Sequence, residues 1–145
     1  MREDTLSPKL VPDSSVIIEG LLSARLTAKE SQPDEVLIHE GLLAYLESLA
    51  QQNKAQGVLG LEELQRVKEA CERLGIRYAF GGRRPGMAEV GRASAPDIDA
   101  MVRELAFEES AHLITADKVQ ARVCAVRGVQ HTYLHIEQIH KTLKL

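Results

Sequence analysis

The sequence predicts an α/β fold, a three-layer α/β/α sandwich around a central, mostly parallel sheet of about five strands. Short aliphatic runs alternate with longer segments whose apolar residues recur every three or four positions. Strands that alternate with helices in this way pair in parallel. We expect a single domain over residues 1–145, with its core within about 9–136, because this length suffices for one sizeable core.

The first half of the chain carries turn and cap signals that divide it into five elements. In order, we expect a strand ending near Asp13, a short helix over residues 19–28, a strand over Glu35–His39, a helix over residues 40–52, and a second amphipathic helix from about Gly57 to Leu74. Pro33-Asp34 is a turn signal before the second strand. Gly75 is placed to cap the last of these helices at its C-terminus.

The second half begins with a strand and contains the least patterned stretch of the chain. In order, we expect a strand over residues 76–80, a loop over 81–95 with a helical turn at Met87–Gly91, a helix from Pro96-Asp97, a strand over His112–Thr115, a helix over Lys118–Arg127, a strand over 129–134, and an amphipathic turn carrying Ile136, Ile139 and Leu143. The loop is rich in glycine and lies between two patterned segments. We therefore interpret it as a functional or mobile loop and not as a domain linker.

Composition is that of an ordinary globular domain, with 44% apolar and 27% charged residues. The net charge of -3 argues against wholesale coating of nucleic acid, and 3% aromatic residues without Trp argue against extensive base stacking. Cys71 and Cys124 match neither a zinc spacing nor a disulfide framework, so we expect two reduced, buried thiols. The chain shows neither a signal-peptide core nor a membrane-length apolar run, which predicts a cytoplasmic protein without a membrane partner.

Four acidic residues stand where a strand should end or a helix should begin: Asp13, Glu40, Asp99 and Asp117. In an open parallel sheet, ligands bind in the crevice outside the carboxyl ends of the strands. Carboxylates gathered there repel one another and lose hydration, so such a cluster persists mainly when a cation lies among them. This placement predicts a metal-dependent hydrolase.

Each acid also has a purely structural interpretation. Asp13 and Asp117 are plausible helix N-caps, because Asp is favoured there. Asp97, Asp99 and Glu40 are plausible first-turn charges, because the helix dipole favours acids at that end. The quartet is stronger evidence than its members, since four independent caps need not converge on one crevice.

The chemistry of an all-acid site agrees with metal-dependent hydrolysis. Mg²⁺ and Mn²⁺ are hard cations that carboxylate oxygen and water can hold without His or Cys ligands. Such ions activate a water molecule and stabilise a departing oxygen, so no protein nucleophile is required. The lack of a convincing Ser/His/Asp or Cys/His arrangement fits this mechanism.

Three segments resemble the PIN-domain family. They are the opening Val11-Pro12-Asp13-Ser14-Ser15-Val16-Ile17-Ile18, the helical segment from Asp97 to Ala106, and Leu113-Ile114-Thr115-Ala116-Asp117-Lys118. Two further segments, Gly57-Val58-Leu59-Gly60-Leu61-Glu62-Glu63-Leu64 and Gly82-Arg83-Arg84-Pro85, resemble more closely the PIN domain at the N-terminus of prokaryotic PilT-like ATPases that also carry a KH domain. The resemblance runs from about Leu10 to Ile136 and lies in the order and spacing of the motifs.

The resemblance implies a metal-dependent endoribonuclease that cuts single-stranded RNA with Mg²⁺ or Mn²⁺. The implied metal-binding acids are Asp13, Glu40, Asp99 and Asp117, with Asp97 as a neighbour at the same helix start, and the implied site-tuning hydroxyls are Ser14 and Thr115. The family often has Thr at the place of Ser14, and usually a small residue or proline where His39 precedes the Glu. Neither departure removes a carboxylate.

Five basic residues are best placed to meet an RNA backbone: Arg83, Arg84, Arg92, Lys118 and Arg122. Their alternative role is that of solvated surface charges. His39 and His112 lie in strand patterns and are expected to pack in the interior. His131, His135 and His140 show no zinc-like spacing with cysteines, and we assign them no chemistry.

Two biological settings and one alternative function stay open. The nuclease is either a stand-alone toxin held by an antitoxin protein or one domain of a PilT-like ATPase, whose phosphate loop does not occur in this sequence. The alternative is a non-catalytic RNA-binding or oligomerisation module with a vestigial acidic site. The leucine-rich helices around residues 42–64 could then supply the face of a homodimer or higher oligomer.

Overall fold

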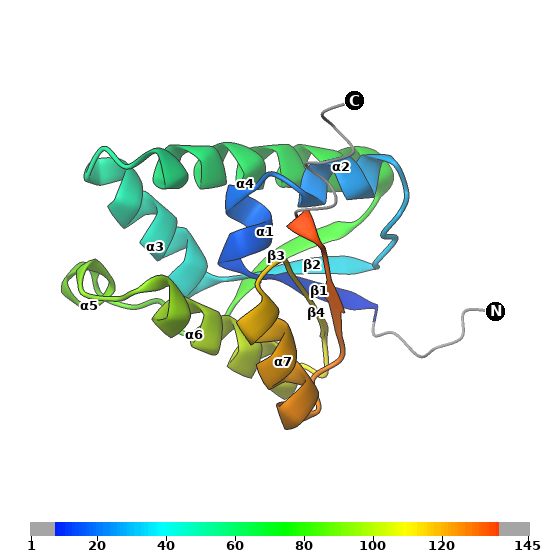
Figure 1. The fold of residues 1–145 in the computed structure, drawn as a ribbon. Helices are drawn as coiled ribbons and strands as arrows, with labels where there is room; N and C mark the ends of the chain where they lie inside the picture. Colours follow the sequence, from blue (N-terminus) through cyan, green and yellow to red (C-terminus); the bar gives the residue numbers. More distant parts are fainter. Residues whose placement is uncertain (1–7, 137–145) are drawn as a thin grey trace.

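The computed structural model describes residues 8–136, in which five strands form one parallel sheet (Figure 1). The strands are β1 (Lys9–Pro12), β2 (Glu35–His39), β3 (Arg77–Gly81), β4 (His112–Thr115) and β5 (His131–Tyr133). Their order is β3-β2-β1-β4-β5, and every neighbouring pair is parallel. The predicted fold class is confirmed, and the described sheet is wholly parallel instead of mostly so.

Helices cover both faces of this sheet and complete three layers (Figure 1). They are α1 (Ser14–Ile18), α2 (Leu22–Thr27), α3 (Glu40–Gln51), α4 (Ala55–Leu74), α5 (Met87–Gly91), α6 (Ala95–Glu108) and α7 (Lys118–Arg127). In the view of Figure 1, α2 and α4 lie above the sheet and α6 and α7 below it. The core between these layers is aliphatic, with fully buried side chains that include Val11, Ile38, Leu42, Ile98 and Leu113. None of the helices in residues 8–136 is long and apolar enough to cross a membrane.

The strand order places a topological switch point between β1 and β4, the position at which open parallel sheets bind ligands. The chain runs outward from β1 through β2 to β3, and then crosses back to β4 and β5 on the other side. At such a switch point the connections after two neighbouring strands diverge and leave room outside their carboxyl ends. Asp13 directly follows β1, and Asp117 comes two residues after β4. The topology thus brings together two acids that are 104 positions apart in the sequence.

The segment after β1 differs from its prediction. The β-branched residues Val16, Ile17 and Ile18 lie in helix α1, which begins immediately after Asp13. The predicted helix over residues 19–28 is shortened to α2, because Gly20 turns the chain with a φ of 70°. Burial of Val16 and Ile17 outweighs the low helix propensity of β-branched residues.

Helix α4 begins earlier than predicted and contains the two glycines that were expected to mark its start. A Cβ at Gly57 would lie 2.2 Å from the backbone nitrogen of Ala50, and one at Gly60 would lie 2.5 Å from Leu46 Cδ2. Both glycines therefore permit close packing of α4 against α3, which outweighs their poor helix propensity.

Most other boundaries agree with the predictions to within one or two residues. Gly75 and Gly128 end α4 and α7 in the left-handed conformation, with φ values of 72° and 81°. Helix α5 coincides with the predicted helical turn within the glycine-rich loop. Ile139 and Leu143 of the last predicted turn lie outside the described residues.

Gly57→Ala is expected to destabilise the protein by roughly 1–3 kcal/mol, because the added methyl group meets backbone atoms of α3 that cannot move independently. The matched control is Gly91→Ala at the end of α5, where an added Cβ meets nothing within 4 Å. Urea unfolding followed by circular dichroism should show a lower midpoint for the first variant and an unchanged or higher one for the second. Equal midpoints would contradict the close-packing role of Gly57.

Candidate active site

Asp13 is fully buried and connects β1, α1 and β4. It is the N-cap of α1, where its Oδ1 accepts hydrogen bonds from the backbone N–H groups of Ser15 at 3.1 Å and Val16 at 3.3 Å. The same oxygen accepts from Ser15 Oγ at 2.6 Å, and the other accepts from Thr115 Oγ1 at 2.5 Å. The prediction that Asp13 caps a helix is therefore confirmed. The same residue also lies at the switch point, where a ligand crevice is expected.

Asp99 approaches the same crevice from the first turns of α6. Its side chain is 6% exposed, and its Oδ1 accepts a hydrogen bond from Ser14 Oγ at 2.8 Å. Its backbone carbonyl accepts from Gln120 Nε2 at 2.8 Å, which connects α6 to α7. Gln120 in turn accepts from Arg103 Nη1 at 2.7 Å. The carboxylate of Asp99 is thus held from α1, and the backbone carbonyl of the same residue from α7.

Asp117 completes the group as the half-buried N-cap of α7. Its Oδ1 accepts from the backbone N–H of Val119 at 2.9 Å, and its own N–H donates to Thr115 Oγ1 at 2.9 Å. Because the Thr115 hydroxyl also donates to Asp13, this one side chain joins the turn after β4 to the turn after β1. The hydroxyls of Ser14 and Thr115, which were predicted to tune the site, donate hydrogen bonds to Asp99 and Asp13, respectively.

The three carboxylates share one electrostatic environment. Burial raises the pKa of Asp13 above its ordinary value, and the charge of Asp117 adds to this, against the hydrogen bonds from Ser15 and Thr115. Burial raises the pKa of Asp99 to about 7, and the negative charges of Asp13 and Asp117 contribute in the same direction. Near neutral pH the cluster therefore resists holding all of its negative charge without a cation.

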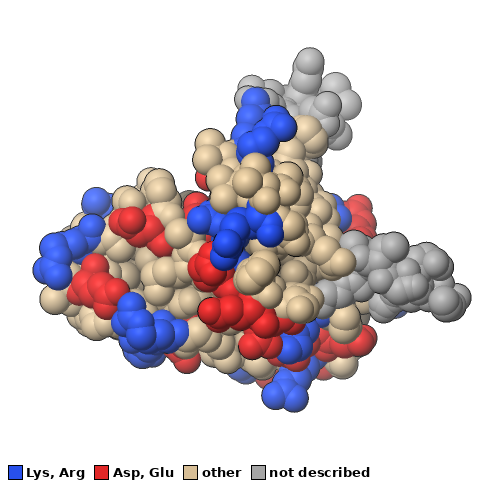
Figure 2. Space-filling model, turned by 90° about the horizontal axis from the view of Figure 1, so that it is seen from below, with Lys and Arg blue, Asp and Glu red and all other residues tan. Residues whose placement is uncertain are grey.

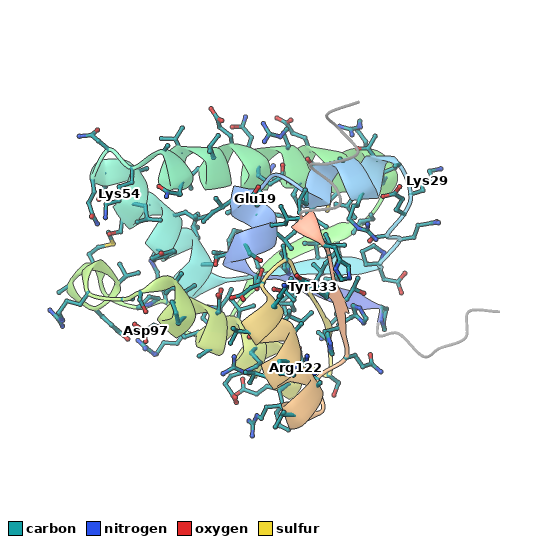
Figure 3. The ribbon with its side chains drawn as sticks, in the orientation of Figure 1. Glu19, Lys29, Lys54, Asp97, Arg122 and Tyr133 are labelled. Atoms are coloured by element: carbon teal, nitrogen blue, oxygen red, sulfur yellow. The ribbon has the colours of Figure 1, made fainter. Side chains whose placement is uncertain are left out.

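The other two predicted acids are not brought into this group. Glu40 opens α3 at the end of β2 and pairs with Arg84, with 3.6 Å between Arg84 Nη1 and Glu40 Oε1. Asp97 is exposed and forms a capping box with Ser94, whose backbone N–H lies 2.8 Å from Asp97 Oδ2. These hydrogen bonds hold the pKa of Asp97 below its ordinary value. Figure 3 shows Asp97 near the start of α6, at the rim of the molecule.

The donor set suits a hard divalent cation, although its side chains are engaged with one another. Carboxylate and hydroxyl oxygens are the ligands that Mg²⁺ and Mn²⁺ prefer, and a cation would relieve the repulsion between the acids. Within residues 8–136, no three acidic, histidine or cysteine side chains lie together closely enough to hold a metal ion as they stand. The fit therefore rests on the chemistry of the donors, whose oxygens accept from Ser14, Ser15 and Thr115.

The predicted RNA-binding residues fall into two groups that differ in how their charges are compensated. Arg83 makes two hydrogen bonds to Glu89, the shorter of 2.7 Å, and Arg84 pairs with both Glu40 and Glu47. Arg92 is exposed at the end of α5, and Lys118 and Arg122 are exposed on α7. Figure 2 shows the face below α6 and α7, where basic side chains alternate with acidic ones and form no continuous band.

The residues predicted to be inert are packed as expected. His39 is buried, and its Nδ1 accepts from the N–H of Gly41 at 2.7 Å. His112 is buried against Thr132, with 2.7 Å between His112 Nε2 and Thr132 Oγ1. Burial lowers the pKa of both imidazoles. Both cysteines are buried free thiols, as predicted.

Sequence reasoning missed two polar residues of the site. Ser15 Oγ donates to Asp13 and accepts from the N–H of Ala116 at 2.8 Å, so it joins the same two turns as Thr115. The sequence signal that could have identified Ser15 is a hydroxyl side chain two positions after the capping residue Asp13. Gln120 is 2% exposed in the first turn of α7, and a polar residue there, between Val119 and Ala121, gave no local signal.

Comparison with known proteins finds similar proteins that bear on the family. No family model matches the chain. It is 28% identical over 131 residues to the uncharacterized KH and PIN-domain containing protein of Methanocaldococcus jannaschii, across 90% of this chain and 20% of that protein. A solved domain of a functionally unknown protein from the same organism is 28% identical, with a TM-score of 0.82, over 88% of this chain and 91% of that one.

These similarities support the PIN-domain prediction. The chain spans about a fifth of the length of the curated relative that it matches. The predicted relation to PilT-like ATPases is addressed by neither match and stays a prediction.

The raised pKa of Asp99 gives a pH dependence of stability. The folded protein keeps a proton on Asp99 up to about pH 7, whereas the unfolded chain loses it near 4. The contribution of Asp99 is thus fully present below about pH 4 and is lost as pH rises through 7, a decrease of roughly 4 kcal/mol in the free energy of unfolding.

Asp99→Asn, which keeps an oxygen for Ser14, should therefore raise the urea midpoint in EDTA at pH 8 and leave it nearly unchanged at pH 4. Glu62→Gln, an exposed acid on α4, serves as the charge-matched control. An equal effect of Asp99→Asn at both pH values would show that the carboxylate is not destabilised in the folded state.

Proposed function

We propose that this protein is a metal-dependent endoribonuclease that hydrolyses phosphodiester bonds of single-stranded RNA. The observation that carries the proposal is the convergence of Asp13, Asp99 and Asp117 at the switch point of a parallel sheet, with Asp99 shifted to a pKa of about 7 by burial and by the other two charges. Groups of interacting carboxylates with strongly shifted pKa values in a crevice are typical of functional sites.

Asp13, Asp99 and Asp117 would hold Mg²⁺ or Mn²⁺, whereas Glu40, at the start of α3, is paired with Arg84 outside this group. When bound, such an ion supplies an activated water and stabilises the oxygen that leaves phosphorus. The chain's own part is positional. Ser15 and Thr115 fix the orientation of the Asp13 carboxylate, and Ser14 fixes that of Asp99.

RNA as the substrate is supported by the resemblance to PIN domains and by the curated relative, whose name includes a KH domain. KH domains bind single-stranded nucleic acid. The basic residues Lys118 and Arg122, on the helix that begins at Asp117, are available for phosphate contacts. The settings of a toxin with its antitoxin and of one domain in a larger ATPase both remain proposals.

A second candidate function has its own observation in its favour. The Asp13 oxygens are occupied by four hydrogen bonds, and no described group of acids is close enough to hold a metal ion as it stands. A non-catalytic RNA-binding module would keep these acids for their structural contacts alone. It would bind RNA without metal and lose nothing when Asp117 is replaced by Asn.

The first test is cleavage of a mixed-sequence single-stranded RNA in Mn²⁺, Mg²⁺ or EDTA. We expect metal-dependent cleavage that falls about 100-fold or more in Asp117→Asn, because a ligand is lost while Asn retains the cap of α7. Asp97→Asn is the matched control, since it removes a charge from an exposed cap and should change the rate less than about three-fold.

A thermal shift measurement gives a readout that is independent of activity. Millimolar Mn²⁺ should raise the melting temperature of the wild type at pH 8, and raise it less in Asp99→Asn or Asp117→Asn. Metal-independent behaviour in both assays would exclude the nuclease and favour the binding module.

A further inference from the structure

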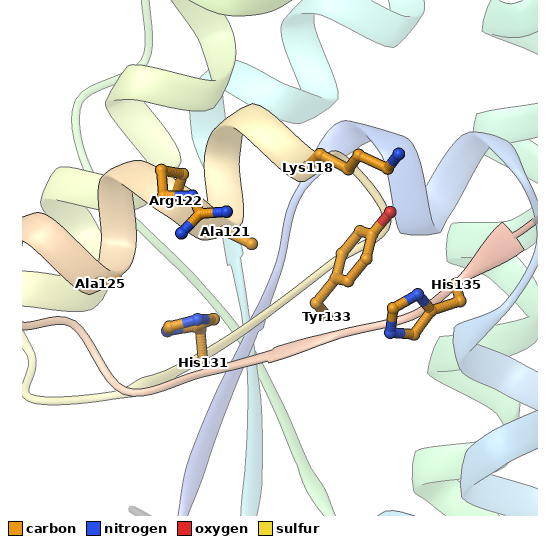
Figure 4. A pocket seen from close by; sticks show the side chains of 7 residues that line it. All are labelled: Lys118, Ala121, Arg122, Ala125, His131, Tyr133 and His135. Atoms are coloured by element: carbon orange, nitrogen blue, oxygen red, sulfur yellow. The ribbon is translucent and has the colours of Figure 1, made fainter.

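A pocket of about 450 Å³ opens between α7 and the edge strand β5 (Figure 4). Its walls combine two cations, two imidazoles, one phenol ring and two alanines: Lys118, Arg122, His131, His135, Tyr133, Ala121 and Ala125. No predicted metal-binding acid lines it, so it is a different place from the carboxylate cluster.

The two walls follow from the regular spacing of the sequence. Lys118, Ala121, Arg122 and Ala125 recur at three and four positions and thus share one stripe of α7. His131, Tyr133 and His135 alternate and thus share one side of the β5 segment. β5 is an edge strand, so no further strand of the described sheet pairs with it on its outer side.

The two cations of this pocket differ from Arg83 and Arg84 in their ion pairing. Among the described residues, neither Lys118 nor Arg122 forms an ion pair, whereas Arg83 and Arg84 each pair with acids. In Figure 4 the amine of Lys118 lies toward the hydroxyl end of Tyr133. Ala121 and Ala125 contribute small side chains to the helix wall of the same pocket. Such a surface offers positive charge and an aromatic face to one ligand.

The pocket directly adjoins the acidic cluster. Tyr133 is the register partner of Thr115, whose hydroxyl donates to Asp13, and paired strands lie about 4.8 Å apart. Lys118 follows Asp117 in the sequence. A nucleotide held here would therefore be a close neighbour of a phosphodiester at the carboxylates.

We propose that this pocket binds one nucleotide of single-stranded RNA next to the bond that is cut. Lys118 and Arg122 contact its phosphate, and its base stacks on Tyr133. Stacking on an aromatic ring beside a cationic groove is the usual means of holding single strands without sequence preference. His135 supports the ring from its edge, with ring centroids 4.4 Å apart and an interplanar angle of 67°. The inference rests on the proposed function for the identity of the ligand as RNA.

Fluorescence polarisation of a labelled single-stranded RNA 10-mer, measured in EDTA, tests the pocket apart from catalysis. Lys118→Gln/Arg122→Gln should weaken binding at least ten-fold and reduce the slope of log affinity against log salt by about 1.4, the value for two phosphate contacts on a single strand. Lys29→Gln/Lys54→Gln is the control of equal net charge, on exposed residues away from the pocket (Figure 3). It should leave affinity and slope unchanged.

The stacking part has its own pair of variants. Tyr133→Leu should weaken binding about ten-fold without changing the salt slope, and Tyr133→Phe, which keeps the ring, should bind like the wild type. Circular dichroism melts establish that each variant is folded.

The outcomes separate the two proposals. RNA binding that is absent in the wild type, or unchanged by the Lys118/Arg122 variant, would overturn the subsite, whatever the cleavage assay shows. Binding that depends on the pocket, in a protein that cleaves no RNA with either metal, would uphold the subsite and defeat the nuclease.

Discussion

The hydrogen bonds of the buried Asp13 carboxylate hold together the carboxyl edge of the sheet. Through Ser15 and Val16 they begin α1, and through Thr115 they fix β4 against β1. Thr115 then accepts from the N–H of Asp117, so the start of α7 takes its position from the same carboxylate. A negative charge without any exposure is tolerated because four donors surround it. The position of Asp117 therefore depends on Asp13.

Burial of a carboxylate does not by itself indicate chemistry, as Glu63 shows. Its side chain on α4 is also fully buried, and it accepts from the backbone of Leu22 and Ser23, at 2.9 and 2.7 Å, and from Arg66 Nε at 3.1 Å. These bonds serve the start of α2, which has no side-chain cap of its own. Asp99 differs because its neighbours include two further carboxylates, Asp13 and Asp117, whose negative charges disfavour its ionised form. The proximity of other carboxylates, and not burial alone, therefore distinguishes Asp99 from a buried acid with a structural role such as Glu63.

The sequence predicted the sheet and three of the acids because their signals are local. A strand followed by Asp, or a helix that begins at Asp, can be recognised from a few neighbouring residues. The helix α1 was missed because its β-branched residues favour strands locally, and only burial against the core overrides that preference. The ion pair of Glu40 with Arg84 was missed for a similar reason, since it joins the end of β2 to the loop after β3. Contacts between separate elements do not produce a periodic pattern in the sequence, so they could not be predicted from it.

The compensation of charge differs between the two ends of the crevice. On the β3 side, Arg84 pairs with Glu40 and Glu47, and Arg83 pairs with Glu89, so both arginines have acidic partners within the protein. On the β5 side, Lys118 and Arg122 lack ion pairs within the described residues, while Asp13, Asp99 and Asp117 repel one another. An anionic strand would compensate the first charges, and a divalent cation would compensate the second. Under the two proposals made above, an RNA phosphate and a metal ion would each compensate one of these two sets of charges.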